Sequence, residues 1–285
     1  MRPRRSVLYL PGANERALQK ASTLAADALV LDLEDSVAPD AKESARRRVC
    51  ETVAAAPYGR REVAIRVNGL DTPWHDADVR AAAEAGPDAV VVPKVGSASD
   101  VHAVEATLAD AGAPERTTIW AMIETPAAVL RAEEIATASD ALTVLVLGTN
   151  DLVKELHAET VRGRAPLLAS LSWCLLAARA AGKPVLDGVY NDVRDTEGFE
   201  AECVQGRQLG FDGKTLIHPS QLEPCNRVFS PSEAETDHAR RVVAAFEEAM
   251  AEGRAVATVD GRMVENLHVE QARRILALAE AAQAH

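Results

Sequence analysis

Eight short apolar runs, each followed by a longer stretch of helical composition, constrain the fold of this 285-residue chain more than any other feature. Most runs are apolar throughout, as in parallel strands that are covered on both faces. The predicted strands are Val7–Leu10, Ala28–Leu33, Val63–Val67, Ala89–Val92, Thr118–Ile123, Thr143–Leu147, Pro184–Leu186 and Thr215–Ile217. This alternation predicts a (β/α)8 TIM barrel in residues 1–225.

The main alternative is a doubly wound open sheet. No Gly-x-Gly-x-x-Gly motif follows the first predicted strand, so the dinucleotide-binding form of that fold is not favoured. Residues typical of helix starts follow several strands: Pro39, Ser99, Thr125 and Pro166. The barrel therefore remains the preferred architecture.

The pattern changes in residues 226–285, where we expect a helical extension. A capping box with proline at its second position, Ser230-Pro-Ser-Glu233, predicts a helix that runs to about Met250. The Asp260-Gly261 pair predicts a hairpin turn, and a last helix is expected at roughly Val269 to Ala282. This segment is too short for a confident separate domain, so we expect it to dock on the barrel or on a neighbouring subunit.

Composition limits the partners of this protein. The net charge of −12 argues against nucleic acid or an anionic membrane as the main partner. No apolar run approaches the roughly 18 residues of a membrane helix. The four cysteines match neither a zinc site nor a redox pair, which indicates reduced thiols and a cytoplasmic location.

Polar residues close the predicted strands. Catalytic groups of TIM barrels come from the carboxyl ends of the strands, so the residues there are the candidates for chemistry. They are Pro11-Gly12, Glu34-Asp35, Arg66 with Asn68, Lys94, Glu124, Asp151, Asp187 and His218. Several carboxylates at one mouth would repel one another without a cation, and oxygen ligands favour Mg²⁺, with Mn²⁺ as the alternative.

Glu124 and Asp151 are the leading metal ligands, because they follow consecutive strands whose ends lie within reach of one ion. The competing interpretation is that each merely caps the next helix. Thr125 already suits that role after Glu124, whereas Asp151 leads directly into Leu152 and retains the capping alternative.

Three other strand-end positions keep two interpretations each. Arg66 either binds a substrate carboxylate or forms a structural ion pair with Glu34 or Asp35. Lys94 is either a Schiff-base lysine or, as we prefer beside acidic groups, a charge-balancing residue. His218 is either a ligand-facing group or, as we prefer, a brace of its own loop. Alternation about Leu33 is expected to send Asp32 and Glu34 to one side and Asp35 to the other.

Taken together, eight segments resemble the citrate lyase beta-subunit-like proteins of the HpcH/HpaI aldolase/citrate lyase family, which includes malyl-CoA and citramalyl-CoA lyases. They cover nearly the whole chain in order: Arg5-Ser-Val-Leu-Tyr-Leu-Pro-Gly, Leu31-Asp-Leu-Glu-Asp-Ser-Val, Ile65-Arg-Val-Asn, Val92-Pro-Lys, Met122-Ile-Glu-Thr, Gly148-Thr-Asn-Asp-Leu, Ile217-His-Pro-Ser-Gln and Asp260-Gly-Arg-Met-Val.

The resemblance implies a Mg²⁺-dependent lyase that cleaves a 3-hydroxy-3-carboxyacyl thioester, carried by CoA or an acyl carrier, into an acetyl thioester and a 2-oxo acid. It implies that Glu124 and Asp151 bind the metal, that Arg66 contacts the substrate, and that Glu34 with Asp35 supports the water shell of the ion. It also implies a trimer or hexamer in which the C-terminal segment closes a neighbouring site.

One position departs from the pattern of this family. Many relatives carry an Asp, proposed as the acid/base, where this chain has Glu265. We expect Glu265 to donate the proton that the acetyl thioester enolate needs. Two alternatives stay open: an aldolase of free 2-oxo acids, and a catalytically silent barrel that binds a 2-oxo acid or CoA.

Overall fold

The computed structural model describes residues 2–283, which form two compact units. One unit is Arg4–Asn226, and the other contains the chain from Arg227 onward together with its first residues. No helix in the described range is long and apolar enough to cross a membrane.

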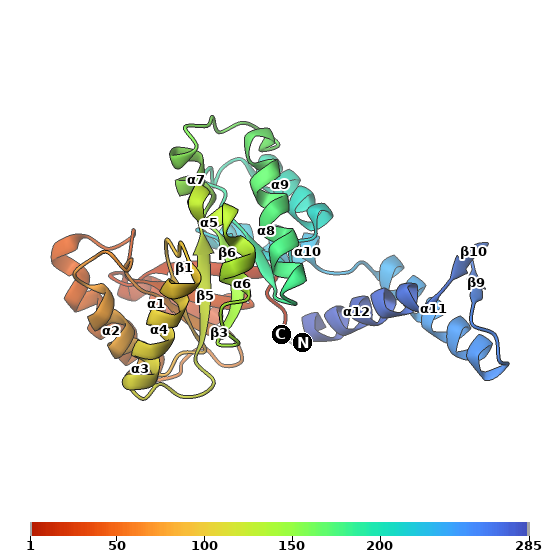
Figure 1. Ribbon diagram of the computed structural model, residues 1–285, viewed down its shortest axis with the longest axis horizontal. Helices are drawn as coiled ribbons and strands as arrows, with labels where there is room; N and C mark the ends of the chain where they lie inside the picture. Colours follow the sequence, from red (N-terminus) through yellow and green to blue (C-terminus); the bar gives the residue numbers. More distant parts are fainter. Residues whose placement is uncertain (1, 284–285) are drawn as a thin grey trace. The chain divides into compact units, whose positions relative to one another are not determined.

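The larger unit is a closed barrel of eight parallel strands in sequence order (Figure 1). The strands are β1 Ser6–Pro11, β2 Ala28–Asp32, β3 Glu62–Arg66, β4 Ala89–Val92, β5 Thr118–Ile123, β6 Leu142–Leu147, β7 Val185–Asp187 and β8 Gly213–Leu216. Parallel pairing of β1 with β8 closes the barrel. Each strand overlaps a predicted apolar run, so the TIM-barrel prediction is confirmed.

Helices follow the strands of the barrel. They are α1 Glu15–Lys20, α2 Lys42–Ala54, α3 His75–Ala85, α4 Ala98–Asp110, α5 Pro126–Leu130, α6 Ala132–Ala136, α7 Thr149–Glu155, α8 Leu168–Ala180, α9 Thr196–Leu209 and α10 Leu222–Phe229. Short 3-10 turns are η1 Ala21–Thr23, η2 Pro39–Ala41, η3 Ala165–Leu167 and η4 Pro219–Gln221. As predicted, Thr125 caps α5 by accepting a hydrogen bond from the Ala128 N–H.

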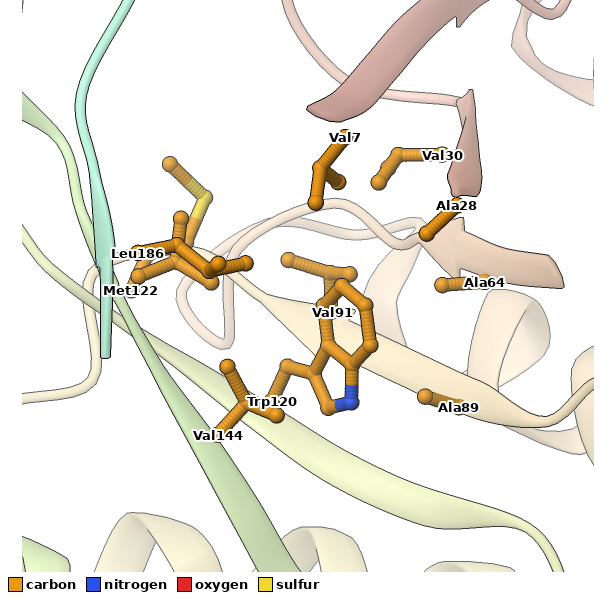
Figure 2. Packing of buried hydrophobic residues seen from close by; sticks show 11 residues of the cluster. Val7, Ala28, Val30, Ala64, Ala89, Val91, Trp120, Met122, Val144 and Leu186 are labelled. Carbon is orange, nitrogen blue, oxygen red and sulfur yellow. The ribbon is translucent and has the colours of Figure 1, made fainter. Parts of the chain in front are cut away.

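Alternate residues of the strands fill the barrel interior (Figure 2). Val7, Val30, Val91 and Leu186 belong to this cluster, and Trp120 is its largest fully buried side chain. Because side chains alternate along a strand, a residue two positions after an inward-facing one also faces inward. This rule decides which strand-end groups face the site.

The smaller unit is a helix, hairpin and helix: α11 Glu233–Ala251, β9 Ala257–Val259, β10 Arg262–Val264 and α12 Asn266–Gln283 (Figure 1). Asp260 and Gly261 both have positive φ, of 50° and 74°, as the predicted hairpin turn requires. The capping box forms two residues later than predicted, because Ser232, not Ser230, exchanges hydrogen bonds with Glu235. An apolar cluster that includes Val242, Val259 and Val269 holds these elements together.

Candidate active site

On three strands, the inward-facing position that follows the apolar core carries a charged residue. These positions lie at the carboxyl end of the barrel. Asp32, Arg66 and Glu124 each follow a core residue by two positions, namely Val30, Ala64 and Met122. All three charged residues line one cavity of about 340 Å³, which Asp151 also lines. The structure therefore brings the two predicted metal ligands and Arg66 to the same cavity.

Arg66 is held by carboxylates. Its Nε and Nη2 donate to the two carboxylate oxygens of Asp32 at 2.6 and 2.8 Å, while Nη1 lies 3.0 Å from Glu34 and 3.5 Å from Asp35. The guanidinium also lies 4.7 Å above the Tyr9 ring. Both interpretations of Arg66 thus have support: it forms the ion pairs, and it remains on the wall of the cavity.

The loop after β2 does not follow the predicted alternation. Asp35 approaches Arg66 from the same side as Glu34, although alternation was expected to separate them. The expectation was wrong because β2 ends at Asp32, so the pleat of the strand does not extend to residues 34 and 35. Lys42 fixes this loop by donating to the Leu33 and Glu34 carbonyl oxygens at 2.8 and 2.7 Å.

Glu124 is buried and is oriented by backbone groups. The Lys94 N–H donates to its Oε1 at 2.7 Å, and Lys94 adopts a left-handed conformation with φ of 53°. Gly148 is required on the other side, because a Cβ there would collide with the Glu124 carboxylate. A strained non-glycine backbone that serves a buried carboxylate is typical of functional sites.

Neither proposed ligand acts as a helix cap. Asp151 lies in the first turn of α7, whose N-terminus has no side-chain cap hydrogen bond, and Thr125 provides the cap of α5. The capping alternative that remained for Asp151 is therefore wrong. Both carboxylates are left to face the cavity.

Negative charge exceeds positive charge around this cavity. Burial raises the pKa of Glu34 to about 8, with Asp35, Glu124 and Asp32 adding to the shift against the opposing effect of Arg66. Burial likewise raises the pKa of Glu124 to about 7, and the Asp151 charge contributes. A cation between Glu124 and Asp151 would relieve this repulsion.

The pKa of Lys94 shifts in the direction expected for a charge-balancing residue. Burial opposes its charge, but Glu34, Asp151, Glu124 and Asp35 outweigh that effect and raise the pKa. Its Nζ lies 4.0 Å from Glu34. A raised pKa makes an amine a poor nucleophile, which disfavours the Schiff-base alternative.

The donor set suits a hard cation with open coordination positions. No group of three or more His, Cys, Asp or Glu side chains that could hold a metal occurs within residues 2–283, so Glu124 and Asp151 would bind an ion together with other oxygens. Mg²⁺ commonly keeps several waters or substrate oxygens beside one or two carboxylates. The residues present therefore fit magnesium.

One strand-end carboxylate points away from this mouth. Asp187 follows the inward-facing Leu186 by one position, so it faces outward, where it contacts Arg164 at 2.6 Å and Lys214 at 3.0 Å. Its inclusion among the groups at the mouth was wrong. His218 braces its own loop as expected, since its Nδ1 accepts from the Ser220 N–H.

Glu265 belongs to the second unit, between β10 and α12, where its N–H donates to Nδ1 of His268. Sequence reasoning did not select three residues that build the barrel site: Asp32, Lys42 and Tyr9. Asp32 and Tyr9 could have been selected, because each lies two positions after an inward-facing strand residue. The role of Lys42 depends on how α2 packs against the loop after β2.

Two family models and several known proteins match this chain. The HpcH/HpaI aldolase/citrate lyase family matches residues 5–219, and a family described as carbon-carbon bond lyase of the TIM-barrel fold matches residues 166–282. The (3S)-malyl-CoA thioesterase of Cereibacter sphaeroides is 55% identical over 279 residues, covering 98% of this chain and 95% of that protein.

Two further relatives extend the comparison. Citrate lyase subunit beta of Escherichia coli is 40% identical over 284 residues, covering 98% of this chain and 94% of its own. The crystal structure of CitE from Mycobacterium tuberculosis with magnesium, acetoacetate and coenzyme A is 31% identical, with a TM-score of 0.79 over 96% of this chain and 97% of that one. This chain belongs to the HpcH/HpaI aldolase/citrate lyase family, an assignment that its fold, its motifs and these matches share.

Proposed function

We propose that this protein is a Mg²⁺-dependent carbon-carbon lyase that cleaves a 3-hydroxy-3-carboxyacyl thioester of the malyl-CoA, citramalyl-CoA or citryl-CoA type into an acetyl thioester and a 2-oxo acid. The observation that carries the proposal is the joint lining of one cavity by Glu124, Asp151 and Arg66. Two acidic ligands and one fixed cation suit a substrate whose reacting carbon bears a hydroxyl and a carboxylate.

Glu124 and Asp151 would hold the metal, and the family relationship and the magnesium in the CitE structure support this ion. When bound, Mg²⁺ would stabilise negative charge on the substrate oxygens as the carbon-carbon bond breaks. Lys94 orients Glu124 through its N–H and lowers the net negative charge at the mouth.

Arg66 would supply the fixed positive charge for the oxygens of the substrate. Asp32 takes one N–H from Nε and one from Nη2, so the other N–H groups of the guanidinium are left for Glu34 and for a ligand in the cavity. Because Asp32, Glu34 and the Tyr9 ring fix the guanidinium, it would not need to reorganise during the reaction. Glu34 and Asp35 would support the water shell of the ion.

Glu265 would donate the proton to the departing acetyl thioester enolate. Since it belongs to the smaller unit, we further propose that the protein forms a trimer or hexamer in which this unit closes the site of a neighbouring subunit. The carrier of the thioester would be CoA or an acyl carrier, and the protein would act in the cytoplasm. The CoA in the CitE structure supports a CoA thioester.

A second candidate is hydrolysis of the same thioester. The relative named (3S)-malyl-CoA thioesterase, 55% identical along nearly the whole chain, favours it. Hydrolysis would release CoA and malate instead of acetyl-CoA and glyoxylate. The two reactions share the binding of the hydroxy acid and differ in the bond that breaks.

Product analysis separates these reactions. The protein is incubated with malyl-CoA and MgCl₂, and glyoxylate, free thiol, acetyl-CoA and malate are measured with and without EDTA. Equal amounts of glyoxylate and acetyl-CoA, lost with EDTA, are expected for the lyase. Free thiol with malate would establish hydrolysis and contradict carbon-carbon cleavage. Citramalyl-CoA and citryl-CoA are tested in parallel, and binding of 2-oxo acids without any turnover would indicate the silent barrel.

A further inference from the structure

Tyr9 differs from the other two tyrosines of this chain in what its hydroxyl contacts. The Tyr58 hydroxyl donates to the Leu18 carbonyl oxygen at 3.0 Å, and the Tyr190 hydroxyl donates to Asp195 at 2.6 Å. The Tyr9 hydroxyl has only the sulfur of Met122, at 3.7 Å, as its partner among the described residues. A thioether is a weak acceptor, so this hydroxyl of a partly buried tyrosine has no oxygen partner among the described residues.

Tyr9 lines the cavity and reaches Met122 on another strand. Tyr9 lies on β1 and Met122 on β5, which are opposite strands in a closed barrel of eight, so the side chain reaches across the barrel. Tyr9 pairs in register with Val30, and Val30 and Met122 precede Asp32 and Glu124 by two positions. Tyr9 therefore starts from the layer below the charged residues, and the residue lines the same cavity.

The charges around Tyr9 keep its proton on the hydroxyl. Burial raises its pKa, and Asp32, Glu124 and Glu34 add to the shift although Arg66 opposes it. The hydroxyl therefore stays protonated near neutral pH and can donate a hydrogen bond within the cavity. An acceptor supplied by a ligand would complete its hydrogen bonding.

We propose that the Tyr9 hydroxyl donates a hydrogen bond to the carboxylate of the 2-oxo acid half of the substrate and sets the depth at which that half binds. The inference rests on the proposed function, because it takes a 2-oxo acid as the ligand that reaches Glu124 and Arg66. Arg66 lies over the Tyr9 ring and both residues line the same cavity, so one carboxylate bound in that cavity can accept from the guanidinium and from the phenol.

The test uses Tyr9→Phe, which keeps the ring beneath Arg66 and removes only the hydroxyl. Calorimetric titration of glyoxylate, pyruvate and oxaloacetate in MgCl₂ is expected to show affinity at least about 10-fold weaker than that of the unaltered protein, since a hydrogen bond to a charged group is lost. Titration of Mg²⁺ alone should give equal affinities, because Tyr9 is not a proposed ligand.

Tyr58→Phe is the matched control. It removes a hydroxyl that has a good acceptor outside the cavity, so we expect a melting temperature about 2–4 °C lower and unchanged 2-oxo acid affinity. Tyr9→Phe should show the reverse, weaker binding at an unchanged melting temperature. This crossed result distinguishes a ligand contact from a structural hydroxyl.

Three outcomes would overturn the inference. If Tyr9→Phe and the unaltered protein bind 2-oxo acids with equal affinity, the proposed hydrogen bond is contradicted and the proposed function is not. Weaker binding together with a lower melting temperature, or with weaker Mg²⁺ binding, would assign the hydroxyl a structural role. Failure of the unaltered protein to bind any of the three acids with Mg²⁺ would contradict the proposed function itself, and this inference with it.

Discussion

Two clusters of charged residues, one on the inner and one on the outer face of the barrel, have similar residue types and opposite electrostatic balance. The inner cluster combines Arg66 and Lys94 with a larger set of carboxylates: Asp32, Glu34, Asp35, Glu124 and Asp151. Lys42 contacts the loop that carries Glu34. The outer cluster pairs Arg164 and Lys214 with Asp187 and Glu202. Balanced charges stabilise the fold, whereas surplus negative charge leaves a site for a cation.

Burial and pKa shifts follow this difference. Asp187 and Lys214 are both fully buried, and despite burial Lys214 and Arg164 lower the pKa of Asp187. In the inner cluster, by contrast, the pKa values of Glu34 and Glu124 are raised. A carboxylate with lowered pKa contributes to stability when charged, and one with raised pKa is destabilising when charged. The two clusters should therefore respond in opposite ways to neutralisation.

The largest effect is expected from Glu124→Gln combined with Asp151→Asn. This change removes both proposed ligands and should lower lyase or thioesterase turnover by at least about 10³-fold, since stabilisation of the developing charge is lost. Calorimetric Mg²⁺ binding should disappear, while the melting temperature without metal should stay the same or rise. Retained Mg²⁺ binding would show that the ion lies elsewhere.

Asp187→Asn tests the outer cluster. It leaves Arg164 and Lys214 with one remaining carboxylate, so we expect a loss of unfolding free energy of about 3–5 kcal/mol, measured by urea denaturation. Glu124→Gln, the matched change in the inner cluster, should not lower stability. Because Asp187→Asn alone can prevent folding, Asp187→Leu with Lys214→Met serves as a second variant, and removal of both partners should recover most of the lost stability. Unchanged stability of Asp187→Asn would contradict the structural role of this cluster.

A more gradual effect is expected on the pH dependence of stability in EDTA. The folded-state pKa of Glu34 is about 8, above its unfolded value near 4.3, so the folded state binds the proton more tightly and stability falls as pH rises from about 5 to 8. The size should be on the order of a few kcal/mol. Glu34→Gln should make the curve less steep, with Glu124 supplying the remaining slope, as measured by urea unfolding at intervals across this range.

Asp187 has the opposite dependence and provides the comparison. Its folded-state pKa is lowered, so its contribution is complete above the unfolded value near 3.9 and is lost as pH falls below about 4. Glu34→Gln should leave that acid limb of the curve unchanged. If both limbs shift together, the two clusters are not independent.

Particular residues show what could be predicted from the sequence. The strands could be located because parallel strands covered on both faces are apolar throughout, and Glu124 and Arg66 could be selected because they close such runs. Asp187 closes a run in the same way yet faces outward, since it lies one position after an inward-facing residue. A strand-end residue faces the mouth of the barrel when it occupies an inward-facing position of the strand. Directly following an apolar run is not sufficient.

Other features depended on packing. Asp35 joined Glu34 near Arg66 because β2 stops pairing at Asp32, a boundary set by the neighbouring strands. Lys42 reaches the β2 loop from α2, and Tyr9 meets Met122 from the opposite strand. Contacts between residues distant in the chain cannot be predicted from local composition.

The sequence by itself determined the alternation of strands and helices, the polar residues that end the strands and the turn of the C-terminal hairpin, because each follows from the periodicity or conformational preference of neighbouring residues. Only the tertiary structure decided which charged groups face the cavity and which are neutralised on the outer face. Strand ends, registers and helix packing depend on partners far along the chain. They determine whether a carboxylate pairs with a cationic side chain, as Asp187 does with Lys214, or lines the cavity where a metal could bind.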